Sequence, residues 1–297
     1  MTELEISAVI PAYNEQDAIA PVVKALTDLL KRRTRNFEII VVDDGSTDAT
    51  FENARGAGVV ALRHPMNRGY GRSLMTGFAK AKYPWILMID ADGSYPPEEA
   101  ERLLDGATDC DLIIGARQGK SYWGTRMQAW RRSIYLSLAS FVAGEEIPDA
   151  NSGLRLLRRS AFDRSMPFLC LGYSFTTTMT LSFIQSGRFV RYVPIRFVER
   201  TGKSKVKAVR DILRTLQIMT QMMIYYNPLK LAVTASAAVL TWAFAAFFVV
   251  RAWSDLPTAL TVSAVAASSA LVIFFLGCVL DAVRLHFAAQ KGPVTLD

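Results

Sequence analysis

The sequence of 297 residues predicts an α/β protein with a mostly parallel, Rossmann-like sheet, helices on both sheet faces, and a membrane anchor. Two observations lead to this prediction. Up to Gly115, short apolar runs alternate with longer amphipathic stretches, as strands and helices do in a doubly wound sheet. Toward the C-terminal end, two uncharged apolar runs are each long enough to cross a bilayer.

Each strand is predicted from a short apolar run that ends at turn residues. These runs are Ile6–Ile10, Phe37–Asp43, Val59–Leu62, Trp85–Asp90 and Asp111–Ile114. The stretches between them predict helices over Gln16–Lys31, Asp48–Ala57, Gly69–Ala81 and Pro97–Leu104. The residues at two of the predicted helix starts support these bounds. Ser46-Thr47-Asp48 supplies capping side chains, and Pro97-Glu98-Glu99 suits a first helical turn.

The pattern changes after Gly115. Gly119–Gly124 indicates a loop, and apolar residues from Met127 to Phe141 then recur at helical spacing. A longer apolar stripe runs from Val209 to Tyr226. It predicts either an ordinary core helix or, since it stands just before the membrane segment, an amphipathic helix in the membrane interface.

The two uncharged runs are Leu231–Val250 and Ala259–Leu280, joined by Arg251–Pro257. The alternative is a pair of buried helices in a large soluble core, but both runs are apolar on every face, which favours a transmembrane hairpin. Basic residues precede the first run and follow the second, at Arg284 and Lys291, whereas the joining loop carries one Arg and one Asp. The positive-inside rule therefore predicts a multi-pass protein of the cytoplasmic membrane with both ends in the cytoplasm.

We expect four segments: a catalytic domain at 1–205, a juxtamembrane amphipathic helix at 206–228, two transmembrane helices within 229–282, and a cytoplasmic tail at 283–297. The N-terminal residues lack the cationic region of a signal peptide. Two spans per chain also suggest self-association into a homo-oligomer.

The formal net charge of +7 is concentrated between Arg188 and Arg214. Nucleic acid attracts such a patch as well, but the position beside the membrane favours anionic lipid or a lipid phosphate as the partner. We therefore expect no nucleic-acid binding. The cysteines show no metal-binding spacing.

Carboxylates end two of the predicted strands, and ligands of open α/β sheets bind outside the carboxyl ends of strands. Asp43 and Asp44 are adjacent and repel each other, so we expect them to bind ligand hydroxyl or imide groups rather than only to cap the next helix. Asp90 and Asp92 flank Ala91 and can converge on one Mg²⁺ or Mn²⁺ that also holds phosphate oxygens. The alternative for this spacing is a solvated acidic turn.

Basic residues complement these acids. Arg117 follows the last of the predicted strands, Arg131 and Arg132 lie on the next helix, and Arg200–Lys205 precedes the membrane segment. Arg binds phosphate through a bidentate fork and Lys acts as a point charge. The alternative is simple contact with lipid headgroups.

Asp149 opens a polar cluster, Asp149–Arg155, in apolar surroundings. It is expected to orient an acceptor, to act as a base, or only to begin a turn. The chain has two histidines, His64 and His286, and the second lies at the membrane end, so a histidine base is not expected. A phosphate acceptor is already ionised near neutral pH and needs no base.

The loop Pro11–Glu15 follows the first predicted strand. Tyr13 can pack on a flat base, and Glu15 can accept hydrogen bonds from a base or a ribose. A loop with Asn and Glu is otherwise merely solvated.

These motifs together resemble the GT-A glycosyltransferases, and within them the dolichol-phosphate mannose synthases and bacterial polyprenol-phosphate glycosyltransferases. The matching stretches occur in the family's order across residues 6–205, and the two-span tail is similar to that of its two-helix bacterial members. They are Pro11–Glu15, Val42–Asp48, Asn67–Gly71, Asp90–Asp92, Ser152–Arg155 and Arg200–Lys205. Where mannose synthases have Gln shortly after the D-x-D acids, this chain has Ser94-Tyr95, which leaves the sugar open.

The resemblance implies a role for each matching residue. It places the donor nucleotide on Pro11, Tyr13, Glu15, Val42, Asp43, Asp44, Asp90 and Ala91, and the metal on Asp90 and Asp92. It places donor or acceptor phosphates on Arg117, Arg200, Ser204 and Lys205, and the lipid phosphate near Arg131 and Ser133. Asp92, Arg117 and Asp149 are the catalytic candidates.

The resulting hypothesis is an inverting transferase that moves a hexose from a nucleoside diphosphate sugar, UDP- or GDP-linked, to undecaprenyl or dolichyl phosphate with Mg²⁺ or Mn²⁺. One alternative is a processive polysaccharide synthase, but such synthases carry a Q-x-x-R-W motif, and Gln128-Ala-Trp-Arg131 has a different order. The other is a membrane scaffold with an inactive transferase fold.

Overall fold

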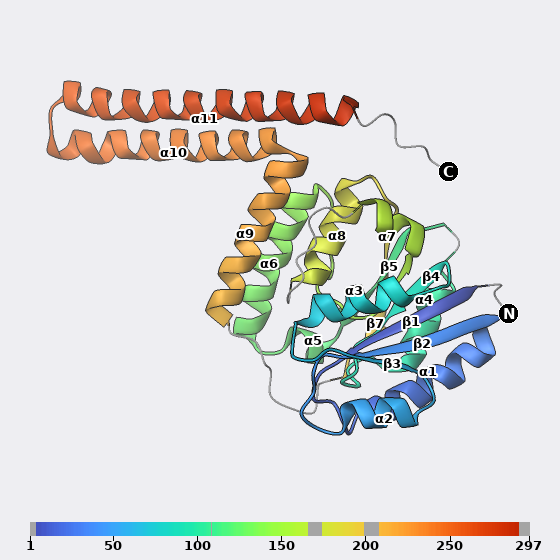
Figure 1. Cartoon of the computed structure of the whole chain (residues 1–297). Helices are drawn as coiled ribbons and strands as arrows, with labels where there is room; N and C mark the ends of the chain where they lie inside the picture. The colour runs from blue at the N-terminus through green and yellow to red at the C-terminus, as the bar shows by residue number, and fades with distance from the viewer. Residues whose placement is uncertain (1–3, 108, 166–173, 199–207, 291–297) are drawn as a thin grey trace. The chain divides into compact units, whose positions relative to one another are not determined.

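The computed structural model describes residues 4–107, 109–165, 174–198 and 208–290 (Figure 1). The chain divides into two compact units, residues 1–215 and 216–297. The boundary between the units falls within helix α9 (Ala208–Tyr226). The segment boundaries predicted at residues 205, 228 and 282 stay predictions.

A seven-stranded sheet organises the described part of the first unit, in the order β3-β2-β1-β4-β6-β5-β7. The strands are β1 (Glu5–Ala12), β2 (Asn36–Asp43), β3 (Val60–Arg63), β4 (Trp85–Met88), β5 (Leu112–Gln118), β6 (Arg155–Arg158) and β7 (Val190–Arg196). β6 pairs antiparallel with β4 and with β5, and the other strand pairs are parallel. The predicted fold class, a mostly parallel α/β sheet, is confirmed.

Helices cover both faces of this sheet because successive strand residues point to opposite sides. Ile6, Ala8 and Ile10 of β1 join one core with α1 (Ile19–Arg33), α2 (Thr50–Gly56) and α4 (Pro97–Leu104), whereas Val9 joins the other. That second core is built with α3 (Tyr70–Lys80), α7 (Arg159–Ser165) and α8 (Phe175–Gln185). The two helical layers are visible on either side of the sheet in Figure 1.

Most predicted elements of the first half are confirmed, and α4 has the predicted bounds with Glu98 and Glu99 in its first turn. The predicted loop at Gly119–Gly124 is wrong, because Lys120–Trp123 forms the short helix α5. One helical turn is too short to show a period, and Gly119 and Gly124, both with positive φ, bracket it. Four elements, β6, α7, α8 and β7, were not predicted from the sequence. After α5, α6 (Arg126–Ala143) carries the predicted helical pattern.

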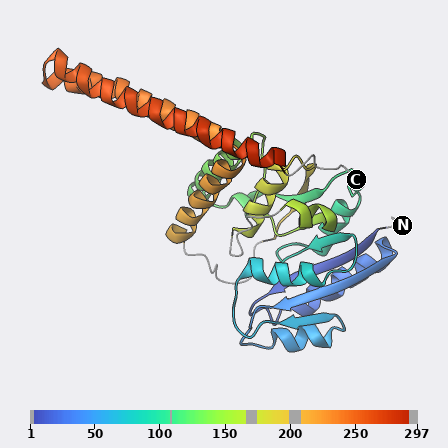
Figure 2. The same cartoon turned by 45° about the horizontal axis from the view of Figure 1, so that its top comes forward.

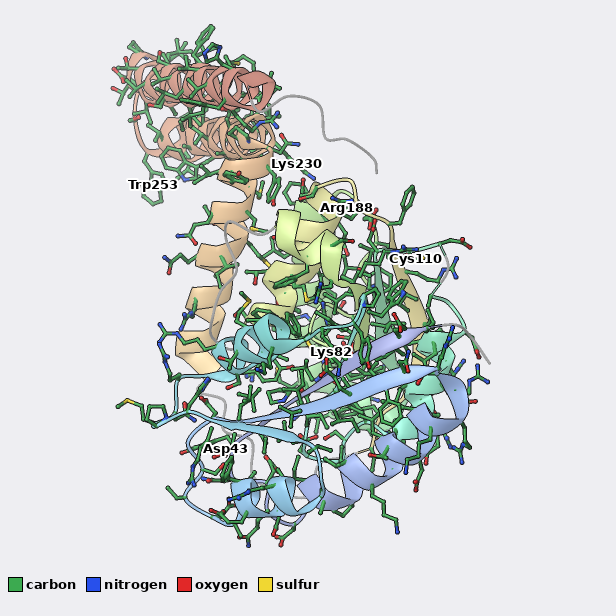
Figure 3. The ribbon with its side chains drawn as sticks, turned by 45° about the vertical axis from the view of Figure 1, so that its right-hand side comes forward. Asp43, Lys82, Cys110, Arg188, Lys230 and Trp253 are labelled. Atoms are coloured by element: carbon green, nitrogen blue, oxygen red, sulfur yellow. The ribbon has the colours of Figure 1, made fainter. Side chains whose placement is uncertain are left out.

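The second unit contains α10 (Pro228–Trp253) and α11 (Leu256–Gln290), which lie side by side and antiparallel (Figures 1 and 2). Small residues allow close packing: a Cβ on Gly277 would stand 2.0 Å from the Cβ of Ala232. Ser236 Oγ donates to the Ala270 carbonyl at 2.9 Å. Figure 3 labels Lys230 and Trp253 near the two ends of α10. Both helices are long and apolar enough to cross a membrane, as predicted.

The packing of α3 on β1 generates the first prediction. Gly77 stands at this crossing, and a Cβ there would lie 2.3 Å from Val9 Cγ1. Gly77→Ala should therefore destabilise the protein by about 1–3 kcal/mol through overpacking, measured as a lower melting temperature. Gly56→Ala is the matched control, because a Cβ on Gly56 in α2 meets nothing within 4 Å. Equal melting temperatures for the two variants would contradict this packing.

Candidate active site

The candidate site lies at the carboxyl edge of the parallel strands. The register pairs Asp43 with Ala12 and with Arg63, so β1, β2 and β3 end together. Because β6 runs in the opposite direction, the loop that precedes it reaches this same edge, with Arg155 paired to both Met88 and Ile114. Figure 3 labels Asp43 at this edge and Cys110, which precedes β5, toward the other end of the sheet.

Two loops at this edge are joined by hydrogen bonds. Asn14, with a φ of 54°, donates its backbone N–H to Ser46 Oγ at 2.9 Å and accepts from the Thr47 N–H through Oδ1 at 2.9 Å. The Glu15 N–H donates to Thr50 Oγ1 at 2.8 Å. The predicted nucleotide residues Tyr13 and Glu15 are therefore half-buried in a fixed loop, whereas the side chains of Pro11 and Val42 are buried within their strands.

Asp43 is fully buried at the end of β2. Its Oδ1 accepts from the Ser46 N–H at 3.1 Å, and its Oδ2 lies 3.2 Å from Arg63 Nε. These contacts build the turn after β2 and neutralise the carboxylate. Contact of Asp43 with a nucleotide stays a prediction, and it has to compete with these protein donors.

Asp44 ties β2 to the segment that precedes α3. Oδ1 accepts from the Arg68 N–H at 2.9 Å and lies 2.7 Å from His64 Nδ1, and Oδ2 accepts from the Gly69 N–H at 2.7 Å. The second ring nitrogen of His64 lies 2.9 Å from Thr76 Oγ1 on α3. The adjacent acids therefore organise two different loops, which reduces the repulsion that the sequence pattern implies.

Asp90 is held from two sides after β4. The Tyr70 hydroxyl donates to its Oδ1 at 2.8 Å. Burial and the neighbouring Asp90 carboxylate raise the pKa of Tyr70 well above its usual range, so this hydroxyl stays a donor. On the other side Gly153 approaches so closely that a Cβ would stand 2.1 Å from Asp90 Oδ2. Only glycine fits this position beside the carboxylate.

The residues after β4 fit a divalent cation. Asp90 and Asp92 supply hard carboxylate oxygens, and Asp92 Oδ1 also accepts from the Ser94 N–H at 3.0 Å. In the described part of the chain, no group of three or more metal-binding side chains is present. A cation held here would therefore complete its shell with ligand phosphate and water, which is how Mg²⁺ is usually bound. Ala91 between the two acids is buried.

Half-buried Arg117 and buried Asp149 form a bidentate ion pair. Arg117 donates from Nε to Asp149 Oδ2 at 2.7 Å and from Nη2 to Oδ1 at 2.9 Å. The Arg117 and Asn151 backbone N–H groups donate to the same carboxylate at 3.2 and 3.1 Å. Burial alone would lower the pKa of Arg117, but Tyr95 and Asp149 outweigh it and hold that pKa well above its usual range.

Aromatic rings clamp this ion pair. The Arg117 guanidinium lies 4.8 Å from the ring centre of Tyr122 on α5 and 5.3 Å from that of Phe197. Arg132 of α6 lies over the Tyr122 ring at 4.1 Å. Burial and the Asp149 charge raise the pKa of Tyr122 to about 12, so this phenol stays neutral between two cations. Such cation–π contacts fix the direction of Arg117.

The loop before β6 rests on a buried polar layer. Arg155 is fully buried and donates to the Ser152 carbonyl at 2.8 Å, to the Ala150 carbonyl at 2.7 Å and to Thr180 Oγ1 at 2.8 Å. Burial lowers the pKa of Arg155. Asn151 Oδ1 accepts from the Tyr135 hydroxyl at 3.1 Å. Helix α8 contributes threonine hydroxyls to this layer, which explains why a buried helix is rich in hydroxyl groups.

The structure thus brings together some of the predicted site residues. Asp90, Arg117 and Asp149 all act electrostatically on Tyr95, whose hydroxyl accepts from the Gly153 N–H at 2.7 Å. Arg131 and Ser133, predicted beside a lipid phosphate, are exposed on α6. The predicted phosphate contacts Arg200, Ser204 and Lys205 lie outside the described residues.

Four residues that contact the candidate site were not predicted from the sequence as site residues: Tyr70, Tyr95, Tyr122 and Gly153. Tyr70 and Gly153 lie inside matching motifs, and Tyr95 stands three residues after Asp92, so the available signal was their place in or near these motifs. Tyr122 carried no such signal because it stands in the stretch predicted as a loop.

Comparison with known proteins shows the family to which this chain belongs. Residues 7–165 match the Glycosyl transferase family 2 model, and the chain belongs to this family. The chain is therefore a glycosyltransferase, as the motif resemblance predicted.

Similarity to individual relatives covers more of the chain than the family model does. An undecaprenyl-phosphate mannosyltransferase from Micrococcus luteus is 31% identical over 221 residues, which cover 68% of this chain and 88% of the relative. An undecaprenyl-phosphate 4-deoxy-4-formamido-L-arabinose transferase from Edwardsiella ictaluri is 31% identical over 210 residues, covering 67% of this chain and 62% of the relative. These relatives agree with the predicted polyprenol-phosphate group.

Solved structures confirm the fold. Glucosyl-3-phosphoglycerate synthase from Mycobacterium tuberculosis, in complex with Mn²⁺, uridine diphosphate and glucosyl-3-phosphoglycerate, matches with a TM-score of 0.57 at 20% identity. The match covers 74% of this chain and 79% of that chain.

The contact between Gly153 and Asp90 generates the second prediction. Gly153→Ala places a methyl group where the Asp90 carboxylate stands, so Asp90 must rotate away. A displacement of about 1 Å in a reacting assembly costs about 100-fold in rate. We expect sugar transfer to fall by about this factor with little change in melting temperature. Gly56→Ala is again the control, and wild-type transfer by Gly153→Ala would contradict the close approach.

Proposed function

We propose that this glycosyltransferase transfers a sugar from a nucleoside diphosphate sugar to the phosphate of a polyprenyl phosphate, giving a polyprenyl-phosphate sugar. The observation that carries the proposal is the close approach of Asp90 to the loop before β6, which also contains Asp149, the partner of Arg117 on β5. Acids on one side suit a diphosphate-bound cation, and guanidinium groups on the other suit phosphate. The names of the two undecaprenyl-phosphate transferase relatives support the acceptor class.

The proposed reaction inverts the configuration at C1 of the sugar. An oxygen of the lipid phosphate attacks C1, and the bond from C1 to the diphosphate oxygen breaks with its electron pair moving to the leaving nucleoside diphosphate. The acceptor oxygen is already ionised near neutral pH, so no side chain has to remove a proton. The chain's own part is to hold donor and acceptor in line and to stabilise charge.

Asp90 and Asp92 are the residues proposed to hold Mg²⁺ or Mn²⁺. When bound, such a cation would neutralise the negative charge that develops on the departing diphosphate. The proposal assigns neither the donor sugar nor the nucleotide base. The two relatives are named for different sugars, and no contact among the described residues favours UDP over GDP.

The third prediction tests this function directly. Purified protein is offered undecaprenyl or dolichyl phosphate with a panel of labelled UDP- and GDP-sugars and Mg²⁺ or Mn²⁺, and the lipid fraction is analysed. We expect one labelled lipid product with the wild type and none with Asp92→Ala, whose melting temperature should stay near that of the wild type. Label in a polymer would instead favour a processive synthase, and full turnover by Asp92→Ala would contradict the metal assignment.

Asp149 was a candidate base, and we propose instead that it positions Arg117. Its carboxylate already accepts two guanidinium and two backbone hydrogen bonds, which use its lone pairs. The two side-chain bonds from Arg117 to Asp149 use Nε and Nη2. We propose that the remaining nitrogen, Nη1, faces a phosphate of the donor or of the acceptor.

The fourth prediction separates these two roles of Asp149. Removing one partner of a buried ion pair costs about 3–5 kcal/mol, so Asp149→Asn should lower both the melting temperature and the rate of transfer. Arg117→Lys should lower both as well, because an ammonium cannot replace the bidentate fork. If Asp149→Asn kept the wild-type melting temperature and lost transfer only, a role as base would be favoured.

We further propose that α10 and α11 cross the cytoplasmic membrane, with the catalytic unit and both ends in the cytoplasm. The basic stretch before α10 and Arg284 near the end of α11 support this orientation. The fifth prediction follows: alkaline phosphatase fused at Ser254 should be active in the periplasm of a bacterial host, and the same reporter fused after α11 should be inactive. The reverse pattern would contradict the orientation. Self-association and a separate juxtamembrane helix at 206–228 remain part of the proposal.

A further inference from the structure

Tyr70 has a contact that the proposed roles above do not use. It is the first residue of α3, and its hydroxyl reaches across the edge of the sheet to Asp90 Oδ1, 2.8 Å away. The Tyr70 side chain is half-buried, and its hydroxyl donates directly to a carboxylate. A neutral phenol that donates to a carboxylate favours one orientation of that carboxylate.

The backbone just before Tyr70 is itself fixed. The Arg68 and Gly69 N–H groups both donate to Asp44, at 2.9 and 2.7 Å. Gly69 adopts a φ of 99°, which favours glycine. Farther back, the segment passes so close to Gly45 that a Cβ on Gly45 would stand 2.6 Å from the backbone carbon of Met66. The backbone that leads into Tyr70 is therefore held in place by these contacts.

These contacts form a continuous connection between the two acidic strand ends. Asp44 at the end of β2 holds the backbone of Arg68 and Gly69, and the next residue, Tyr70, holds Asp90 after β4. Gly153 closes the opposite side of the Asp90 carboxylate. A side chain held in this way has little freedom to rotate when a cation and a diphosphate arrive.

We propose that Tyr70 is a positioning residue that holds the Asp90 carboxylate in the orientation that binds the cation–diphosphate group of the donor. This inference rests on the proposed function, since it assigns Asp90 to that group. Partners that orient a metal-binding side chain change metal affinity or activity by about 10- to 100-fold when removed. Tyr70 itself touches neither donor nor acceptor in this proposal.

The test compares Tyr70→Phe with the wild type and with Tyr83→Phe. Phenylalanine keeps the ring and removes only the donor to Asp90. Tyr83 is the matched control, because its ring lies beside Lys82 near the start of β4, where the Lys82 Nζ is 4.9 Å from the ring centre. Two readouts are used: the Mn²⁺ concentration that gives half-maximal transfer, and Mn²⁺ binding in the presence of UDP or GDP, followed by electron paramagnetic resonance without turnover.

For Tyr70→Phe we expect a rise of about tenfold or more in half-saturating Mn²⁺ and in the KM for the donor, weaker Mn²⁺ binding, and a smaller change in kcat at saturation. Tyr83→Phe should match the wild type in both readouts. An unchanged Mn²⁺ requirement and unchanged Mn²⁺ binding in Tyr70→Phe would overturn the positioning role while leaving the transferase proposal intact.

Failure of the proposed function has a different signature. If the wild type formed no labelled lipid with any donor, the acceptor assignment would fail, yet the resonance measurement would still decide the role of Tyr70. Loss of Mn²⁺ binding in Tyr70→Phe at an unchanged melting temperature would support the positioning role. Loss of Mn²⁺ binding together with a lower melting temperature would overturn that role, because general destabilisation would explain it.

Discussion

β6 runs antiparallel between β4 and β5, and the geometry of the site depends on this reversal. A parallel strand at this position would deliver the loop after it, rather than the loop before it, to the carboxyl edge. The reversal brings Gly153 against Asp90 and Asp149 against Arg117, so residues that are distant along the chain, 32 positions apart for Arg117 and Asp149, share one site. The loop then rests on Arg155, whose charge is buried among carbonyl and hydroxyl oxygens.

A buried site with this many charges is stable only if each charge has a partner. Asp43 has Arg63, Asp44 has backbone amides and His64, and Asp149 has Arg117. Tyrosines complete the arrangement, because Tyr70 and Tyr122 stay protonated beside charged neighbours. The same contacts that stabilise the edge also hold its carboxylates and guanidinium groups in fixed directions, which is the condition for binding a charged donor.

Much of the fold was predictable because its first strands are apolar runs that end at clear turn residues. β1 and β2 are buried over most of their length, and their sequences show it. β6 escaped prediction because it consists of two leucines between two arginines, one of which is fully buried against the usual rule for charged residues. α5 escaped because a single turn has no period, yet it carries Tyr122, which clamps Arg117.

The sequence by itself determined the class of the fold, the two apolar helices and the identity of the acids at the end of β2 and just after β4, because apolar periodicity and residue type are local properties. Only the tertiary structure decided what each acid does. Asp43 and Asp44 hold loops, Asp149 holds Arg117, and Asp90 lies between Tyr70 and Gly153. The reason is physical: a hydrogen bond depends on which distant loops meet at one edge of the sheet, and strand order and direction set those meetings.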